Sequence, residues 1–261
     1  MKTVWSGFCV AFSLYSAIPV PQLPWEKKTM RWALSFLPLV GVLAGALEVL
    51  WFWFCRETGA EAMFYAVFAA LLPAAVSGGI HLDGFADTCD ALCSFGEREK
   101  RLAILKDPHI GAFGVIWLAA FLLAEAACFA QIYRKPALLP LAAAGFALSR
   151  AVGGRKIVTI PCAKDSGLAY LFAEGSDKKA VSLTLAAEWL LGAAGLLLWA
   201  ARRGVGTAVP LCLLLVLLWS AWHRRLCLRD FGGITGDLTG FFISTAELLT
   251  LAVSALGGLI L

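Results

Sequence analysis

Three aspartates at helical spacing are the residues of this sequence best suited to chemistry. Asp83, Asp87 and Asp90 stand at positions i, i+4 and i+7, so on a helix they fall within an arc of about 60°. Carboxylates on one helix face repel one another by roughly 0.2–0.5 kcal/mol per pair, and a bound cation would compensate them. Mg²⁺ is commonly held by one or two carboxylates together with substrate phosphates. The spacing predicts a Mg²⁺ site, the alternative being a solvated helix face without a ligand.

His81 precedes this cluster and is a candidate catalytic residue because of that position, although a lone histidine is more often structural. Zinc is a weaker prediction than Mg²⁺, because no set of Cys and His ligands converges here. The eight cysteines are scattered through the chain without a Cys-x-x-Cys pair, so we interpret them as packing residues.

Basic residues that could neutralise a phosphate follow the aspartates along the chain. Lys106 ends a charged stretch, 97–106, that is typical of an interfacial amphipathic helix and leads into the next apolar run. We therefore expect Lys106 near the aspartates. Arg150 lies near the end of a later apolar run, where an unpaired charge is costly, and this position favours a functional role.

A glycine-rich segment near the C-terminus could bring its backbone close to a phosphate or a metal ion. It reads Gly232-Gly233-Ile234-Thr235-Gly236-Asp237, although glycine-rich turns also join helices routinely. Glu247 follows within the next apolar run and lies within reach of the polar loops. Ionisable residues inside apolar runs are functional candidates by default, and the others of this kind are Glu48, Glu125 and Glu188.

The elements that must position these residues are membrane-spanning helices. Hydrophobic residues make up 60% of the 261 residues, charged residues 15%, and the mean hydropathy is +0.80, whereas a soluble domain is about half apolar and a quarter charged. A spanning helix needs about 20 mostly apolar residues. Seven segments meet this requirement: 35–54, 62–80, 111–131, 136–154, 180–201, 205–222 and 240–261.

We predict an all-α, polytopic integral membrane helical bundle of about seven spans with cytoplasmic amphipathic helices, forming a single domain over residues 1–261. Segment 4–20 leaves open an eighth membrane segment, short and either interfacial or re-entrant. Between these spans, 17 of the 22 Lys and Arg residues fall on one side and 5 on the other. The positive-inside rule places the 17-charge side in the cytoplasm.

The longest polar loops all fall on that same side, so the predicted location is a multi-pass protein of the cell (inner, cytoplasmic) membrane whose active-site loops face the cytoplasm. The net charge of +4 is explained by this topology. It does not indicate nucleic acid as a partner.

The motifs together resemble the cobalamin synthase family, the adenosylcobinamide-GDP ribazoletransferases. The resemblance extends over essentially the whole chain, and the segments that carry it are 18–21, 78–90, 105–111, 149–150 and 232–237. It implies a Mg²⁺-dependent transfer from adenosylcobinamide-GDP to α-ribazole or its 5′-phosphate, with release of GMP. It also implies membrane lipid as surroundings, and it leaves open a homo-oligomer or association with other cobalamin-assembly enzymes.

The resemblance also implies roles for individual residues. Asp83 and Asp87 would ligate Mg²⁺, and Asp90 would be a further ligand or the base that accepts a hydroxyl proton. Asp237 would complete the metal or ribose site. The phosphate and substrate contacts would come from Lys106, Arg150, Lys164, Gly233, Thr235, Gly236 and Glu247. The sequence departs from the family pattern at Ala17, Ala91, His109, Lys164 and Ser244, and a Lys in place of Arg at 164 keeps the charge but loses bidentate phosphate geometry.

Two other functions remain open from the residues alone. One is a CDP-alcohol-type membrane phosphotransferase, which also spaces aspartates on a membrane helix. That type has the motif Asp-Gly-x-x-Ala-Arg, whereas here Asp83-Gly84-Phe85-Ala86-Asp87 is followed by Thr88, with no Arg. The other is a transporter, suggested by the intramembrane glutamates. The clustering of charged motifs in loops on one face argues against it, as does the lack of a repeated pair of broken helices.

Overall fold

A computed structural model describes residues 2–260, and within this range all elements of regular secondary structure are helices. The only extended pairing within these residues is an isolated parallel bridge between Cys162 and Ile234. Short turns of 3₁₀-helix cover Ala33–Phe36 (η1) and Pro136–Leu138 (η2), and a π-helical turn covers Cys227–Phe231 (η3). The α-helices are α1 (Lys2–Tyr15), α2 (Lys27–Met30), α3 (Leu37–Thr58), α4 (Ala62–Ser77), α5 (Ile80–Cys93), α6 (Arg98–Ile104), α7 (Ala112–Arg134), α8 (Leu139–Thr159), α9 (Leu168–Gly175), α10 (Lys178–Arg203), α11 (Ala208–Leu226) and α12 (Gly236–Ile260).

Six helical segments are long and apolar enough to cross a membrane, and they contain α3, α7, α8, α10, α11 and α12. These segments correspond to six of the seven predicted spans. The seventh predicted span, 62–80, corresponds to α4 and the break that follows it. α4 and α5 are long and apolar enough to cross a membrane only when taken together, and they are bent by 99° at the break between them. Segment 4–20 contains a shorter apolar helix, Val4–Tyr15, below the length of a span. The all-α membrane bundle is therefore confirmed, with six to seven spans.

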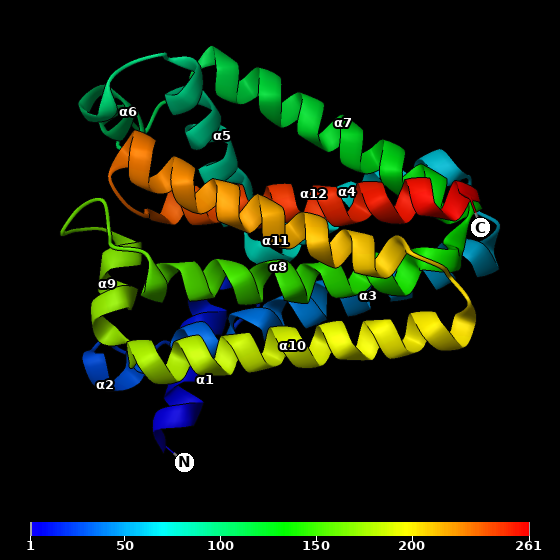
Figure 1. The fold of residues 1–261 in the computed structure, drawn as a ribbon, viewed down its shortest axis with the longest axis horizontal. Helices are drawn as coiled ribbons and strands as arrows, with labels where there is room; N and C mark the ends of the chain where they lie inside the picture. The colour runs from blue at the N-terminus through cyan, green and yellow to red at the C-terminus, as the bar shows by residue number, and fades with distance from the viewer. Residues whose placement is uncertain (1, 261) are drawn as a thin grey trace.

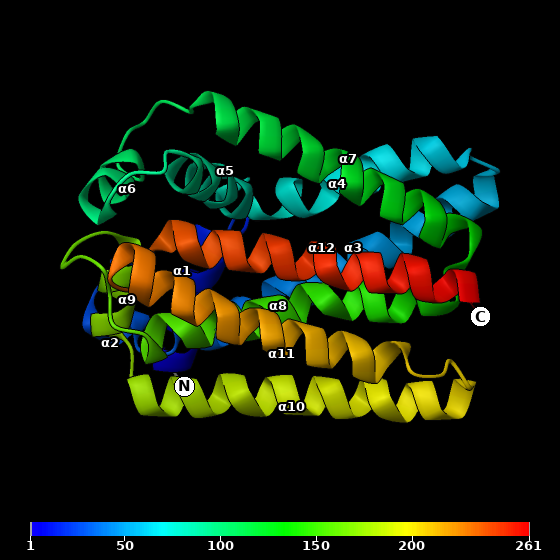
Figure 2. The ribbon, with the colours of Figure 1, turned by 45° about the horizontal axis from the view of Figure 1, so that its top comes forward.

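The helices form an elongated bundle in which α8 and α12 are central. α8 packs against α3, α10 and α12, and α12 also packs against α5, α7 and α11. Figure 2 shows α10 along one edge and α7 with α4 along the opposite edge. In Figure 1 the loops that carry α6 and α9, together with the turn between α11 and α12, gather at the end opposite the C-terminus. We call this end the polar-loop end. The prediction that the long polar loops share one face is confirmed.

Small residues allow the central helices to approach closely. A Cβ atom on Gly41 of α3 would lie 2.2 Å from the carbonyl oxygen of Phe146 in α8, and one on Gly45 would lie 2.3 Å from that of Ala143. Because lipid tails are as apolar as the side chains, the hydrophobic effect does not drive helices together in a bilayer, and they associate largely through such close van der Waals packing. These two glycines therefore fix the separation between α3 and α8.

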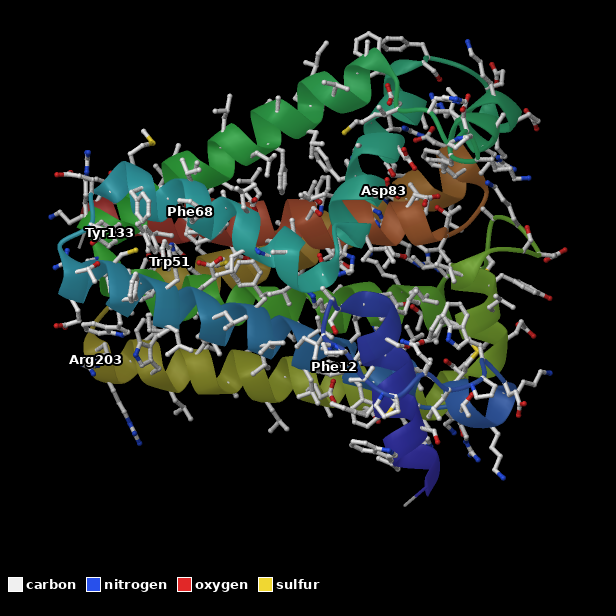
Figure 3. The ribbon with its side chains drawn as sticks, turned by 180° about the vertical axis from the view of Figure 1, so that it is seen from behind. Phe12, Trp51, Phe68, Asp83, Tyr133 and Arg203 are labelled. Atoms are coloured by element: carbon white, nitrogen blue, oxygen red, sulfur yellow. The ribbon has the colours of Figure 1, made fainter. Side chains whose placement is uncertain are left out.

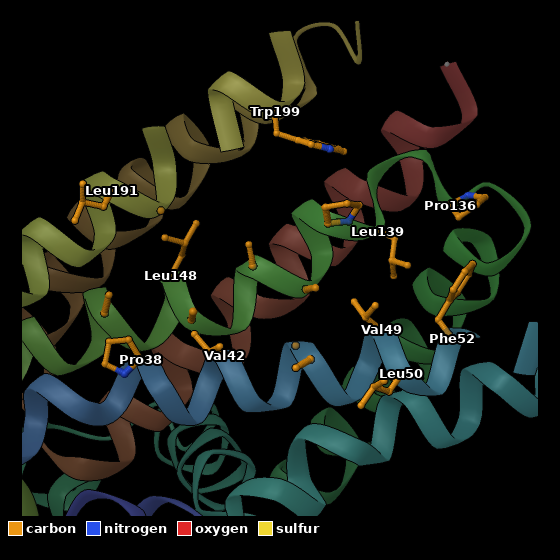
Figure 4. Close-up of a pocket in the computed structure, with 18 of the residues that line it drawn as sticks. Pro38, Val42, Val49, Leu50, Phe52, Pro136, Leu139, Leu148, Leu191 and Trp199 are labelled. Atoms are coloured by element: carbon orange, nitrogen blue, oxygen red, sulfur yellow. The ribbon is translucent and has the colours of Figure 1, made fainter. Parts of the chain in front are cut away.

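A large apolar groove runs beside this contact, between α3 and α10 with α8 as its floor. Its volume is about 1400 Å³, and Figure 4 shows Val42, Leu148, Leu191 and Trp199 around it. The groove lies among the spanning helices rather than at the polar-loop end. It therefore takes no part in the candidate site described below.

Replacing Gly41 with Ala should destabilise the bundle by about 1–3 kcal/mol, because the added methyl group overlaps the backbone of α8. Gly195 on α10 is the matched control, since no atom lies within 4 Å of a Cβ built there. Thermal unfolding of the detergent-purified variants would compare the two. Equal stability of Gly41→Ala and Gly195→Ala would contradict the close packing of α3 on α8.

Candidate active site

The sharp bend between α4 and α5 sets the direction of the aspartate helix. Gly78 and Gly79 have φ values of 65° and 81°, in the left-handed region that residues with a Cβ rarely adopt. The bend turns α5 by 99° relative to α4. It leaves Asp83 exposed and Asp87 half-buried, and Figure 3 shows Asp83 on α5, far from Arg203 at the other end of the bundle.

The crossing of α5 over α12 brings a third carboxylate to this face. A Cβ on Gly84 would lie 2.8 Å from both the Cα and the carbonyl oxygen of Asp237, so the two backbones are in direct contact. The Asp237 carboxylate is close enough to interact electrostatically with Asp83 and Asp87. No ion pair among the described residues involves any of these three aspartates. Their mutual repulsion is therefore not relieved by a direct ion pair.

The glycine-rich turn is held in place by a second loop. The Ile234 N–H donates to the Pro161 carbonyl at 2.8 Å, and the Ala163 N–H donates to the Ile234 carbonyl at 3.0 Å. A Cβ on Gly233 would lie 2.4 Å from the Pro161 oxygen. Gly233 was predicted to let the backbone approach a substrate. The structure instead places the 161–163 backbone against it, because that pairing leaves no room for a side chain.

Thr235 and Gly236 begin α12. The Thr235 hydroxyl oxygen accepts a hydrogen bond from the Leu238 N–H at 3.2 Å, as in an N-cap, and the hydroxyl also donates to the Asp237 carboxylate at 3.3 Å. Thr235 therefore orients Asp237, and it is itself buried. Gly236 is exposed, and no atom lies within 4 Å of a Cβ built on it. The first turn of α12 is open to a ligand at that point.

Two lysines from separate loops lie close to each other, and one of them, Lys164, is close enough to interact electrostatically with Asp237. Lys164 follows the paired 161–163 segment, and its Nζ donates to the Leu102 carbonyl at 3.1 Å. Burial lowers the pKa of Lys164, the positive charge of Lys106 lowers it further, and the carboxylate of Asp237 opposes both effects. Lys106 is exposed. Lys164 thus lies near Asp237, and Lys106 lies near Lys164.

Asp90 has a different role from the one predicted. Its two carboxylate oxygens accept hydrogen bonds from the Gly111 N–H at 2.7 Å and the Gly114 N–H at 2.9 Å. These amides belong to the first turn of α7, which has no partner for them inside the helix. Asp90 therefore caps α7 from outside. This structural role accounts for its carboxylate, and the structure does not favour it as a Mg²⁺ ligand or a base.

Arg150 and Glu247 lie inside the bundle instead of facing a substrate. Arg150 is fully buried, and its guanidinium pairs with Glu247 and donates to the Phe146 carbonyl at 2.9 Å. The Ser149 hydroxyl donates to the same Glu247 carboxylate at 3.0 Å. The prediction that these two residues contact the substrate is therefore not supported, because each satisfies the other's charge away from the surface.

His81 is also buried, at 5% exposure, and its ring stacks on that of Tyr15 with the centroids 6.3 Å apart. Its Nε2 atom has no hydrogen-bond partner. His81 occupies the first turn of α5 beneath the aspartates, and its predicted catalytic role is not supported by this position. The sequence analysis did not predict that the 161–163 segment pairs with the glycine-rich turn and so holds Lys164 near Asp237. No local signal marks it, since its partner lies about 70 residues away.

The candidate site supplies only some of the ligands that a hard divalent cation needs, namely the carboxylates of Asp83, Asp87 and Asp237. Among residues 2–260, no group of three or more His, Cys, Asp or Glu side chains is arranged to hold a metal ion unaided. Mg²⁺, however, often takes only one or two carboxylates and fills its remaining positions with water and substrate phosphate oxygens. Three carboxylates without an ion-pair partner in the described part of the chain, of which Asp83 is exposed and Asp87 and Asp237 are partly buried, fit that mode of binding. They do not fit a closed all-protein site.

Comparison with known proteins identifies relatives over nearly the whole chain. The family model described as cobalamin-5-phosphate synthase matches residues 7–255. Curated relatives named adenosylcobinamide-GDP ribazoletransferase occur in Lachnoclostridium phytofermentans (35% identical, covering 97% of this chain and 94% of the relative), Treponema denticola (31%, 95% and 96%) and Clostridium botulinum strain Alaska E43 (27%, 96% and 97%). No solved structure matches the chain.

Replacing Asp90 with Ala should lower the stability of the protein by about 0.5–2 kcal/mol, the usual cost of removing a helix N-cap. Asp90→Asn retains one acceptor oxygen and should fall between Asp90→Ala and the unmodified protein. Thermal unfolding measures both effects, and the Mg²⁺ concentration for half-maximal activity should not change. A large rise in that concentration for Asp90→Asn would show that Asp90 is a metal ligand after all.

Proposed function

The chain belongs to the cobalamin-5-phosphate synthase family, enzymes of the final step of cobalamin assembly, and we propose that it transfers the adenosylcobinamide phosphate group from adenosylcobinamide-GDP to α-ribazole or its 5′-phosphate. A ribose hydroxyl of α-ribazole attacks the phosphorus that carries cobinamide. The bond from that phosphorus to the bridging oxygen breaks, and GMP leaves. The hydroxyl releases its proton to water, and the new bond joins the ribose oxygen to the phosphorus of the cobinamide phosphate. The family assignment removes the two alternatives, the CDP-alcohol-type phosphotransferase and the transporter.

One observation carries this proposal: three carboxylates and two lysines from four separate parts of the chain meet at the polar-loop end of the bundle. Asp83 and Asp87 come from α5, Asp237 from α12, Lys164 from the 161–163 loop and Lys106 from the segment after α6. Phosphoryl transfer depends mainly on positioning and on neutralising charge. Carboxylates that recruit a metal, beside lysines that contact phosphate, supply both.

Asp83, Asp87 and Asp237 would hold Mg²⁺, which would neutralise pyrophosphate charge and polarise the phosphoryl group. Lys164 would contact a phosphate oxygen on the side of the phosphate away from the metal. Its amine is oriented by the Leu102 carbonyl and lies in a partly desolvated position, where a charged contact is stronger than in water. Lys106, which is exposed, would attract the anionic substrate from solution.

The same site indicates the side of the membrane on which the reaction takes place. The polar-loop end carries α6, α9 and the turn before α12, and the predicted spans assign 17 of the 22 Lys and Arg residues to this side. The positive-inside rule orients that side to the cytoplasm. The proposed location is the cytoplasmic membrane, with substrates arriving from the cytoplasm and lipid surrounding the spans.

Asp83→Asn and Asp87→Asn should each reduce GMP release by at least about 100-fold, because each removes a negative charge from the proposed metal site while keeping the side chain's shape. The assay is GMP formation by detergent-purified protein given adenosylcobinamide-GDP and α-ribazole, with and without Mg²⁺. Glu57→Gln, exposed at the opposite end of α3, is the control and should retain full activity. Unmodified protein that forms no GMP, or forms it equally without Mg²⁺, would contradict the proposal.

Lys164→Ala should raise the KM for adenosylcobinamide-GDP by about 10- to 100-fold, the usual cost of losing one hydrogen bond to a charged group. Lys164→Arg keeps the charge and should lie much closer to the unmodified enzyme. Initial rates at varied donor concentration measure the effect. A fall in kcat with an unchanged KM would place Lys164 away from the bound donor.

A further inference from the structure

A small polar cavity lies inside the bundle, directly beneath the first turn of α5. The room it offers to the centre of a water molecule is about 10 Å³, which is close to the minimum that one water requires. Its polar lining comes from five helices: Ser77 of α4, His81 of α5, Glu125 of α7, Arg150 of α8, and Ser244 with Glu247 of α12. It lies at the point where the helix that carries Asp83 and Asp87 joins the rest of the protein.

Two of the groups around this cavity are buried without a hydrogen-bond partner. The Nε atom of Arg150 and the Nε2 atom of His81 have none, and their residues are 0% and 5% exposed. An arginine Nε–H is always a donor, whereas a histidine Nε2 donates or accepts according to its tautomer. A buried polar group left unpaired costs about 1–3 kcal/mol, and more when it is charged. A partner for both is therefore required inside the cavity.

The charges around the cavity select the kind of occupant. A cation would face the guanidinium of Arg150, and an anion would face the carboxyls of Glu125 and Glu247, which already interact unfavourably with each other. A neutral molecule that both donates and accepts hydrogen bonds meets neither repulsion. Only water combines this property with the available volume.

We infer that one ordered water occupies this cavity, accepts a hydrogen bond from the Arg150 Nε–H, and donates to Glu125 and to His81 Nε2. Such a water joins α5, α7 and α8, and through the pairing of Arg150 with Glu247 it also joins α12. His81 lies two residues before Asp83. The water therefore fixes the first turn of α5, and Glu125 and Arg150 act as positioning residues for the two aspartates above them.

This role rests on the proposed function, since it concerns the placement of the Mg²⁺-binding carboxylates. Glu125→Leu removes the water's acceptor and should raise the Mg²⁺ concentration for half-maximal GMP release by about tenfold. Glu125→Gln keeps an acceptor of the same shape and should restore a value within about twofold of the unmodified enzyme. Glu188→Leu is the matched control, because Glu188 lines the apolar groove instead of the cavity, and its Mg²⁺ dependence should be unchanged.

A merely structural role for Glu125 would lower the thermal unfolding temperature of Glu125→Leu without moving its Mg²⁺ dependence. That outcome would overturn the positioning role. Equal Mg²⁺ shifts in Glu125→Leu and Glu188→Leu would overturn it as well, because the effect would then follow from losing any carboxyl in the membrane.

The water itself can be tested without activity, so that failure of the proposed function does not obscure the result. A crystal structure of the full chain in a lipidic phase, at a resolution that shows ordered waters, should have a density peak within hydrogen-bond distance of Arg150 Nε and Glu125. The peak should be absent in Glu125→Leu and present in Glu125→Gln. A cavity that is empty, or closed by direct contact between Arg150 and Glu125, would overturn the inference.

Discussion

The direct contact between the backbones of α5 and α12 is the constraint on which the candidate site depends. Gly84 lies against the backbone of Asp237, and a Cβ on Gly240 would lie 3.0 Å from the carbonyl oxygen of His81. A larger residue at either glycine would separate the helices and move Asp237 away from Asp83. The bend after α4 is needed for the same contact, because it turns α5 across α12. The close approach of two helix backbones, which only glycine permits, thus brings the charged side chains of the site together.

The polar interior of the bundle serves this arrangement from below. Arg150 is fully buried beside Glu247, and removing one partner of such a pair typically costs about 3–5 kcal/mol, since the other charge is left uncompensated. A buried pair is rarely a net source of stability compared with apolar residues. Its value here is positional: it ties α8 to α12 beneath the first turn of α5. Charged residues inside the helical bundle therefore support the candidate site at its polar-loop end.

Local periodicity and composition predicted the spans, the aspartate helix and the grouping of polar loops, because hydropathy and helical spacing are properties of short segments. The tertiary structure shows that several residues within those segments have roles that differ from the predicted ones. Asp90 stands in register with Asp83 and Asp87, yet it caps α7 through amides more than 20 residues later in the chain. Spacing alone cannot separate a third ligand from a cap, since both require a carboxylate on the same face.

The sequence by itself determined that this is an all-α membrane protein with an acidic helix and basic loops on one side, because the bilayer imposes length and hydropathy on every span. Only the tertiary structure decided which charges meet. Arg150 and Glu247 lie about 100 residues apart and pair in the interior, whereas Lys164 reaches Asp237 through the 161–163 pairing. Such meetings depend on helix crossings and loop contacts between distant segments, and no local pattern encodes those distances.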